Sequence, residues 1–267
     1  MKKILTIAGS DSCGGAGIQA DLKAMSANGT FGMSVITAVT AQNSMGVFDV
    51  QEISDKVIEK QIEVIFDDID VDAVKIGMLS SISIIETVSK GLKKYKPKNV
   101  VIDPVMISKS GYSLLLDSAV EKMKDFVSMA DLLTPNIPEA EVLTGMEIKN
   151  EEDMINAAKK IQKMGVKNIL LKGGHREDNC TDILLTENGD VIKYTGERFD
   201  TKNTHGTGCT LSSTIAAYLG KGYSMEEAVK IGKEYITEAI KNSFSVGEGV
   251  GPVGHFVDLY KKAGMKY

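Results

Sequence analysis

The 267-residue sequence has no tryptophan, five prolines and three cysteines. It also has no apolar run near the roughly 18 residues of a membrane-spanning helix, so we expect no membrane insertion. The formal charge of −5 gives no basic footprint for nucleic acid or for an anionic membrane surface, so neither is an expected partner. With 43% hydrophobic and 25% charged residues, the composition is typical of a folded globular chain and not of a disordered one.

The few cysteines and the first residues bear on the compartment. Cys13, Cys180 and Cys209 are an odd, widely spaced set, which does not suit a disulfide framework and favours a reducing environment. The start, MKKILTIAGSDS, has two lysines before an apolar stretch, but that stretch covers only Ile4–Ala8 and is too short for a signal peptide. We therefore expect a first core strand there and a cytoplasmic protein.

Strand and helix signals alternate along the first two thirds of the chain. This rhythm predicts an α/β fold with a mostly parallel central sheet and helices on both faces. Short β-rich runs predict strands at Ile4–Ala8, Met33–Thr40, Val74–Met78, Asn99–Val105, Asp131–Thr134 and Asn168–Lys172. Apolar residues at helical spacing predict helices from about Ile18 to Asn28, and at Val57–Phe66, Ile82–Lys94, Ala119–Met129, Glu139–Leu143 and Glu151–Met164.

The alternation ends after Lys172. Two β-rich runs, Asp182–Leu185 and Val191–Tyr194, flank a turn that contains Asn188-Gly189, and they predict a hairpin. Two helices are expected after it, at Thr207–Leu219 and Met225–Asn242. Since no Pro/Ser-rich linker and no repeat interrupts the chain, we expect residues 1–267 to form a single domain.

Polar and glycine residues follow the predicted parallel strands. Ligands of open parallel sheets bind beyond the carboxyl ends of the strands, so these residues are the first candidates for a site. They are Gly9–Gly17, Gln42-Asn43, Gly77-Met78, Asp103, Asn136–Glu139 and Lys172–His175.

The first glycine-rich loop spans Gly9–Gly17, between a strand and a helix. Its backbone N–H groups could face an anion or a polar ligand, or the glycines could serve only a tight turn with positive φ. Gly15, Gly17 and Ala20 match the dinucleotide pattern G-x-G-x-x-A, but the next strand ends in Ala41-Gln42-Asn43 without the acid that this fingerprint needs. We therefore reject a dinucleotide site.

A second glycine motif, His205-Gly206-Thr207-Gly208-Cys209, opens a predicted helix. Free N–H groups at a helix start stabilise negative charge that develops on a transferring group. Cys209 lies in the first helical turn, where the pKa of a thiol is expected to be lowered, so it could act as a base or a nucleophile. The alternative is a cysteine that only packs.

Charged residues at three strand ends suit phosphate chemistry. Carboxylates such as Asp103 and Glu139 suit Mg²⁺, which keeps waters and bridges phosphates. Lys172, before two glycines, is a candidate phosphate contact. Each of these residues could instead be an ordinary helix cap or salt-bridge partner.

Taken together, these motifs resemble the hydroxymethylpyrimidine/phosphomethylpyrimidine kinases of thiamine biosynthesis, which have the ribokinase-like fold. The resemblance runs nearly from end to end, and its specificity comes from the combination of blocks. The blocks are AGSDSCGGAGIQADLKA from Ala8, SVITAVTAQN from Ser34, KIGML from Lys75, VIDPVMISKSG from Val101, TPNIPEAE from Thr134, LKGGH from Leu171, TKNTHGTGCTLSS from Thr201 and GPVGHF from Gly251.

The resemblance implies ATP-dependent phosphorylation of 4-amino-5-hydroxymethyl-2-methylpyrimidine, here called hydroxymethylpyrimidine, and then of its monophosphate. Ribokinase relatives have an Asp where this chain has Cys209, which implies that Cys209 is the base. Gly206 and Gly208 would hold the charge of the transferring group through their amides. Nucleotide binding would fall to Asn136, Lys172 and Thr207.

The same resemblance assigns the remaining residues. Asp103 and Glu139 would organise Mg²⁺ through water. Gln42 would bind the aminopyrimidine edge, because an amide both donates and accepts. Asp21 would assist there, and the ring would be lined by Gly9, Met78 and Val105.

Two alternatives stay open. Some bacterial vitamin B6 (pyridoxine/pyridoxal) kinases share the glycine loop and the cysteine, but they tend to lack the Ala41-Gln42-Asn43 and Lys172–His175 blocks. A non-catalytic nucleotide- or vitamin-binding module is the other alternative.

The resemblance also implies a homodimer, and 107–112 is a candidate flap over the substrate.

Overall fold

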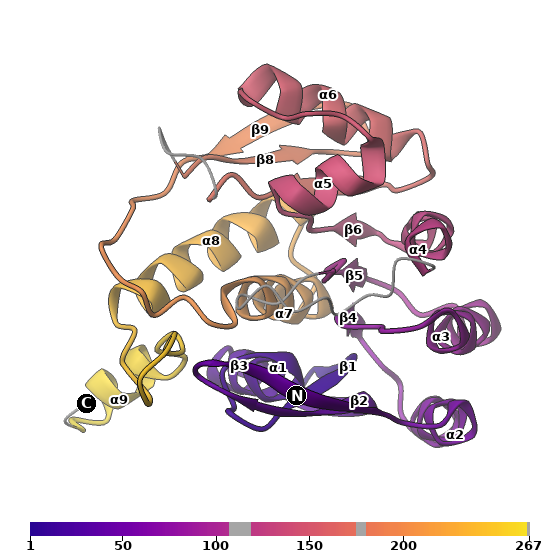
Figure 1. The fold of residues 1–267 in the computed structure, drawn as a ribbon, viewed down its shortest axis with the longest axis horizontal. Coiled ribbons are helices and arrows are strands. Elements are labelled where there is room, and N and C mark those ends of the chain that lie inside the picture. The colour runs from indigo at the N-terminus through magenta and orange to yellow at the C-terminus, as the bar shows by residue number, and fades with distance from the viewer. Residues whose placement is uncertain (107–118, 175–179, 266–267) are drawn as a thin grey trace.

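The computed structural model describes residues 1–106, 119–174 and 180–265. Within them, nine strands form one sheet in the order β3-β2-β1-β4-β5-β6-β7-β8-β9 (Figure 1). The strands are β1 (Lys3–Asp11), β2 (Phe31–Asn43), β3 (Gly46–Glu52), β4 (Ala73–Ile76), β5 (Val100–Ile102), β6 (Leu132–Leu133), β7 (Asn168–Leu171), β8 (Asp182–Leu185) and β9 (Val191–Tyr194).

Six adjacent strands of the sheet, β2, β1, β4, β5, β6 and β7, run parallel. The edge strand β3, at one end, and the strands β8 and β9, at the other, pair antiparallel. The expected mostly parallel sheet is confirmed. β1 lies between β2 and β4, so the order of the strands reverses there. A reversal of this kind opens a crevice at the carboxyl ends, where open α/β sheets bind ligands.

Helices cover both faces of the sheet, as expected (Figure 1). The helices α1, α7 and α8 lie on one face, and α2 to α6 lie on the other. The helices of the described residues are α1 (Gly17–Ala27), α2 (Asp55–Phe66), α3 (Ile82–Tyr95), α4 (Val120–Phe126), α5 (Ile137–Thr144), α6 (Glu151–Gln162), α7 (Thr207–Gly220), α8 (Met225–Lys241) and α9 (Val257–Lys262). A 3₁₀ turn, Val127–Met129, follows α4.

Each face of the sheet has its own hydrophobic core. Neighbouring strand residues point to opposite faces, so Ile4 joins the core under α1, α7 and α8, while Leu5 joins the core under α2 to α6. Strands buried on both faces therefore read as continuous apolar runs. This double burial holds the carboxyl ends of the strands, and the residues that follow them, in fixed positions.

Three features differ from the sequence expectations. β3 and α9 were not predicted; β3 is an edge strand with exposed residues such as Phe48, and α9 is a single short helix near the C-terminus. β1 continues to Asp11 because Ser10 and Asp11 pair with Val39 and Thr40 of β2, so the first glycine loop begins inside the sheet.

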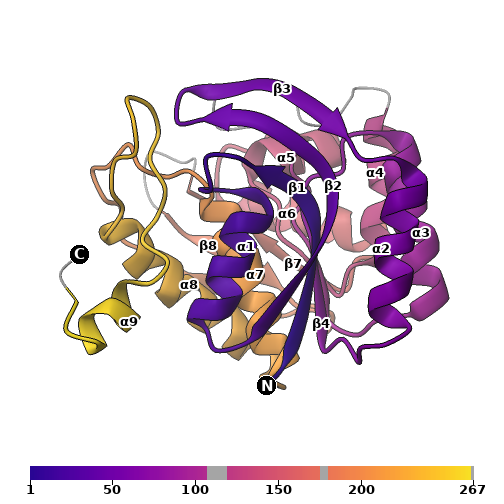
Figure 2. The same cartoon turned by 90° about the horizontal axis from the view of Figure 1, so that it is seen from below.

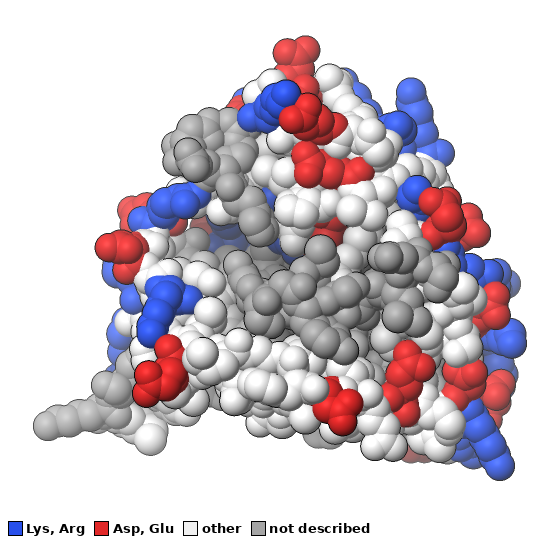
Figure 3. All heavy atoms as spheres, in the orientation of Figure 1, with Lys and Arg blue, Asp and Glu red and all other residues white. Residues whose placement is uncertain are grey.

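β2 and β3 form a long antiparallel ribbon at one end of the sheet, where β3 is the edge strand (Figure 2). On the face shown in Figure 3, acidic and basic side chains are interspersed and form no single-sign field. Among the described helices, none has the length and apolar character needed to cross a bilayer.

Candidate active site

Two adjoining cavities lie at the carboxyl ends of the parallel strands. The first, of about 150 Å³, is bounded by the ends of β1, β2, β4 and β5 and by the start of α7. The second, of about 330 Å³, lies between β8, α7, α8 and residues 196–204. Both cavities are lined by Asn136, Lys172, Thr207 and Gly208. Two ligands, one in each cavity, would therefore meet at the start of α7.

The start of α7 forms part of the wall between the cavities. Its cap residue, Gly206, has φ +75°, and a Cβ there would lie 1.8 Å from the carbonyl oxygen of Gly15. Only glycine fits this position. Gly206 has no side chain to cap the helix, and the N–H of Thr207 donates to the carbonyl oxygen of Thr204 at 3.4 Å. The next N–H groups of the first turn can therefore serve an anion, the usual partner at a helix start.

Cys209 lies in that first turn and lines the first cavity. The sequence expectation of a lowered thiol pKa is wrong. Burial raises the pKa of Cys209 to about 11, although the Lys75 ammonium and a hydrogen bond from the Gly17 N–H act to lower it. Desolvation of the thiolate outweighs the helix position. Cys209 is therefore a thiol at neutral pH in the ligand-free protein.

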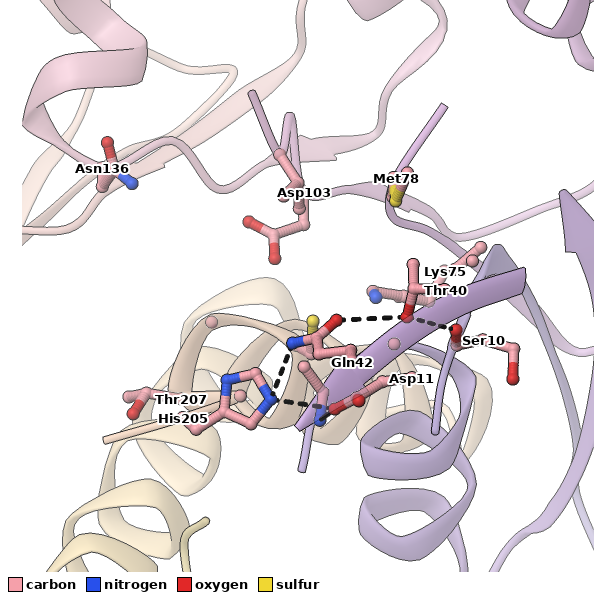
Figure 4. A pocket seen from close by; sticks show the side chains of 18 of the residues that line it. Ser10, Asp11, Thr40, Gln42, Lys75, Met78, Asp103, Asn136, His205 and Thr207 are labelled. Carbon is pink, nitrogen blue, oxygen red and sulfur yellow. Dashed lines mark hydrogen bonds and ion pairs between the residues drawn. The ribbon is translucent and has the colours of Figure 1, made fainter. Parts of the chain in front are cut away.

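Lys75 is a functional candidate that the sequence analysis missed. It is fully buried in β4, yet it lines the first cavity (Figure 4). Its Nζ donates to both carboxylate oxygens of Asp21 at 2.9 Å. Burial lowers the pKa of Lys75, but the charges of Asp21, Cys209 and Asp103 and the hydrogen bond to Asp21 together outweigh burial, so the pKa is raised and the cation persists. A lysine inside a predicted core strand was the signal.

Asp21, expected to assist at the aminopyrimidine edge, does not reach the cavity itself. Its side chain is fully buried and does not line either cavity. Besides Lys75, the carboxylate accepts from Thr6 at 2.6 Å and from Ser213 at 2.7 Å. Both carboxylate oxygens are thus engaged below the cavity, and Lys75 is the partner of Asp21 that lines it.

Asp103, Lys172 and Glu139 meet between the cavities. Lys172 Nζ donates to Asp103 Oδ1 at 2.9 Å, and Thr134 donates to the same oxygen at 3.2 Å. Glu139 and Asn136 form a capping box at the start of α5, with backbone N–H contacts of 2.8 and 2.9 Å. The salt-bridge and cap roles left open by the sequence therefore exist, and these residues also line the first cavity.

Burial and like charge act together on Glu139. They raise its pKa to about 7, because desolvation and the nearby Asp103 oppose ionisation, while Lys172 favours it. Burial also lowers the pKa of Lys172, but Asp103 and Glu139 raise it more, so this lysine stays charged. One cation thus faces two carboxylates, and the group lacks positive charge when both are ionised.

This donor set fits a magnesium ion that arrives with phosphates. Asp103 and Glu139 are hard oxygen ligands, both buried and both facing the cavity. Among residues 1–106, 119–174 and 180–265, no cluster of three or more His, Cys, Asp or Glu side chains could hold a metal ion. Magnesium does not need such a cluster, since it keeps waters and often takes one or two carboxylates plus phosphate oxygens.

The residues expected around a substrate ring lie together in the first cavity. Gly9, Met78 and Val105 line its wall, and Gln42 reaches into it from the end of β2 (Figure 4). The amide of Gln42 lies 3.3 Å from Nε2 of His205 and 3.2 Å from the hydroxyl of Thr40. The wall thus combines apolar contacts with one amide that can both donate and accept.

The second cavity has mixed walls. Leu211, Ile236 and Ile240 supply apolar surface from α7 and α8, and Asp182 and Lys233 form an ion pair at 2.6 Å. The sequence analysis did not find this cavity, because its walls come from a hairpin, a loop and two helices that are not adjacent in the chain. Two expected features, the flap at 107–112 and His175 of the Lys172–His175 block, lie outside the described residues.

Comparison with known proteins identifies the family. Residues 11–254 match the family model described as phosphomethylpyrimidine kinase. The chain belongs to this family. The hydroxymethylpyrimidine/phosphomethylpyrimidine kinase of Haemophilus influenzae is 46% identical over 261 residues, which cover 96% of this chain and 97% of that protein. The thiamine biosynthesis bifunctional protein ThiED of Geobacter sulfurreducens is 45% identical over 95% of this chain and 52% of its own length.

Solved structures agree with this assignment. A phosphomethylpyrimidine kinase from Clostridium difficile 630 is 52% identical, with a TM-score of 0.81 over 90% of this chain and 100% of that chain. An ADP complex of Bacillus subtilis pyridoxal kinase is 41% identical, with a TM-score of 0.89 over 96% and 97%. The resemblance seen in the sequence blocks and the ribokinase-like fold are confirmed.

Proposed function

We propose that this protein transfers the γ-phosphoryl group of ATP to hydroxymethylpyrimidine and then phosphorylates the resulting monophosphate to the diphosphate. The observation that carries the proposal is the meeting of two cavities at Lys172 and at the uncapped start of α7, beside Cys209. The names of relatives such as that of Haemophilus influenzae support the substrate, and structures of related kinases that contain ADP or AMP-PCP support ATP as donor.

The chemistry needs positioning and charge neutralisation more than covalent catalysis. The substrate hydroxyl oxygen forms a bond to the γ-phosphorus while the bond from phosphorus to the bridging oxygen of ADP breaks. The N–H groups of Gly206 and Gly208 stabilise the charge of the transferring group. Lys172 binds the phosphates, with Asn136 and Thr207 beside it.

The hydroxyl proton goes to Cys209 in its thiolate form, which becomes a thiol in the step. A thiol pKa of about 11 leaves only a small fraction of Cys209 as thiolate at neutral pH. Less of the base form is therefore present than for a cysteine whose pKa is lowered at a helix start. The Lys75 cation lowers the cost of the thiolate and is held in place by Asp21. We therefore expect the rate to rise with pH.

In this proposal Asp103 and Glu139 hold Mg²⁺ through water. When bound, the ion would neutralise phosphate charge between the two cavities. Since Glu139 has a pKa raised to about 7, protonation competes with metal binding in the physiological range. Asp103 remains paired with Lys172, which limits the repulsion between the two carboxylates.

The Glu139→Gln variant tests this metal site. Below pH 7 the apparent Mg²⁺ affinity of the wild type should decrease as the pH is lowered, by up to roughly tenfold for each pH unit. The reason is that Glu139 must lose a proton before it can hold the ion. In Glu139→Gln, affinity should be weaker and less dependent on pH. Protonation of ATP itself affects both proteins equally, so the difference between them isolates Glu139. Equal pH dependence in Mg²⁺ titrations of the two proteins would remove Glu139 from the site.

Steady-state kinetics with ATP on hydroxymethylpyrimidine, its monophosphate and pyridoxal, measured side by side, test the function. We expect the highest kcat/KM on the pyrimidine substrates and lower turnover of pyridoxal, which is also a flat hydroxymethyl heteroaromatic. The structural similarity to pyridoxal kinases makes this comparison necessary. Turnover of pyridoxal alone would reverse the substrate assignment, and binding without turnover would favour a non-catalytic module.

A Gln42→Ala variant separates the two cavities. Gln42 lines the first cavity and not the second, so we expect weaker pyrimidine binding and a nearly unchanged KM for ATP. The loss of two hydrogen bonds to the ring predicts a rise in KM of about tenfold to a hundredfold. Isothermal titration with the alcohol and with a nonhydrolysable ATP analogue provides the measurement. Selective loss of nucleotide binding would contradict the assignment of Gln42 to the substrate cavity.

We also propose a homodimer. Val39, Met45 and Phe48 are exposed apolar residues on the β2–β3 ribbon, and the exposed fraction of Phe48 reaches 69%. Large exposed apolar side chains along one edge ribbon suit an interface with a second copy of the chain. Sedimentation velocity of the wild type and of Phe48→Asp tests the proposal, with a dimer expected only for the wild type.

The odd, widely spaced cysteines, all free in the structure, keep the cytoplasm as the predicted compartment.

A further inference from the structure

We propose that His205 determines substrate specificity by fixing which way the amide of Gln42 faces. The ring of His205, held by Asp11, presents an N–H to one end of that amide, and Thr40 accepts from the other end. The amide then meets an aminopyrimidine in one sense only, oxygen to amino group and nitrogen to ring nitrogen. This inference rests on the proposed pyrimidine substrate and names the residue that orients it.

The partners of Asp11 decide where the ring proton lies. Its carboxylate accepts from the backbone N–H groups of Cys13 at 2.8 Å, Gly15 at 3.0 Å and Ala16 at 2.8 Å, and it contacts Nε2 of His205 at 2.8 Å. Three backbone donors favour the ionised form. Burial raises the pKa of Asp11, but the hydrogen bonds outweigh it and the pKa is lowered. Nε2 of His205 therefore carries the hydrogen, whatever the charge of the ring.

That hydrogen constrains Gln42, whose amide lies 3.3 Å from the same Nε2. With the amide nitrogen toward His205, as drawn in Figure 4, two N–H donors would face each other. A half-turn of the amide exchanges its oxygen and nitrogen and removes the conflict. The amide oxygen then accepts from Nε2, which donates to Asp11 and Gln42 together.

Thr40 fixes the other end of the amide in the same sense. Its hydroxyl donates to the carbonyl oxygen of Ser10 at 3.0 Å. A hydroxyl has one hydrogen, and that of Thr40 is used on Ser10. Toward the Gln42 amide, 3.2 Å away, the Thr40 oxygen can therefore only accept, and the amide N–H is the matching donor. Both ends of the Gln42 amide thus have partners only in the orientation with oxygen toward His205.

The ring of His205 cannot move aside easily. It is buried, and a Cβ at Gly15 would lie 2.3 Å from its Cδ2, so the ring packs directly on the backbone of the first glycine loop. The backbone N–H of His205 donates to the carbonyl oxygen of Gly251 at 3.0 Å. The donor that orients Gln42 is therefore held from three directions before any ligand binds.

The oriented amide keeps one lone pair and one N–H for a ligand. In hydroxymethylpyrimidine the amino group lies next to the reacting CH₂OH arm, and a ring nitrogen comes next, which gives a donor followed by an acceptor. Pyridoxal has an aldehyde next to the same arm, which is an acceptor. The fixed amide oxygen would face that acceptor, and an unmatched polar pair reduces binding. His205 thereby favours the aminopyrimidine.

The test compares two substrates in two variants of His205. The substrates are hydroxymethylpyrimidine and the analogue that lacks only the amino group. His205→Leu should lose about tenfold in kcat/KM on the aminopyrimidine, mostly in KM, because one oriented hydrogen bond is lost. Its kcat/KM on the deamino analogue and its KM for ATP should stay within about twofold. His205→Gln should largely restore discrimination, because its Nε2 takes the place of the ring Nε2.

Thr40→Val gives a second test, away from both glycine loops. It removes the acceptor for the amide N–H and should reduce kcat/KM on the aminopyrimidine only, whereas Thr40→Ser should preserve it. Equal losses on both substrates, or no rescue by His205→Gln, would show a purely structural role and overturn the inference. Absence of any pyrimidine turnover in the wild type would instead overturn the proposed function and this inference with it.

Discussion

Replacing Cys209 with alanine should lower kcat on hydroxymethylpyrimidine by about 10²–10⁴, the usual contribution of a positioned acid–base group. The fold should persist, because the change removes one sulfur atom at a position that lines a cavity. The KM for ATP should change little, since Cys209 does not line the second cavity. Single-turnover rates with both substrates saturating provide the measurement.

The pH profile and a matched variant sharpen this prediction. The thiol of Cys209 has a pKa of about 11, and its base form is the thiolate, so kcat should rise with pH between about 6 and 9. Cys209→Asp introduces a base that is ionised at neutral pH and should restore part of the rate with a flatter profile. Near-normal turnover by Cys209→Ala would show that no proton passes through this sulfur.

Replacing Lys172 with methionine should have the second largest effect. Lys172 lines both cavities and holds a positive charge where the phosphates of ATP would lie. Loss of a preorganised cation at a transferring phosphoryl group lowers kcat by about 10²–10³. The same change leaves the buried Asp103 without its ion-pair partner, and breaking such a pair costs about 3–5 kcal/mol of unfolding free energy.

Two controls separate the catalytic and structural parts of this effect. The double variant Lys172→Met/Asp103→Asn removes both charges, so it should regain most of the unfolding free energy measured in urea and none of the rate. Lys233→Met breaks a similarly buried pair with Asp182, but Lys233 lines only the second cavity. It should therefore lower stability with a smaller loss in kcat. Recovery of rate in the double variant would contradict a phosphate role for Lys172.

Much of the fold could be predicted, because its signals are local. The hairpin of β8 and β9 follows from Asn188-Gly189 between two β-rich runs, and α7 begins where the second glycine motif predicts. β3 was missed because an edge strand buries little surface and shows no one-sided apolar pattern. The end of β1 was placed too early because its last residues become strand only by pairing with β2, about 30 residues away.

In the candidate site, too, some features follow from local sequence and others depend on contacts between distant residues. The residues expected around the glycine motifs do line the cavities, because strand ends in a parallel sheet share one edge. The environment of each group was less predictable. Cys209 has a local setting that lowers a thiol pKa, but surrounding elements bury it and reverse the direction. Asp21 lies on the first helix as expected, but its carboxylate is taken by Lys75, 54 residues further along the chain.

The sequence by itself determined the α/β architecture, the family and most of the side chains at the strand ends and glycine motifs, but not Lys75. Periodicity, turn chemistry and motif composition are properties of short segments. Only the tertiary structure decided what these side chains experience. The partner of His205 is Asp11, 194 residues earlier, and the second cavity is walled by elements that are not neighbours in the chain. Burial, ion pairing and hydrogen-bond direction depend on such distant contacts, which no local pattern encodes.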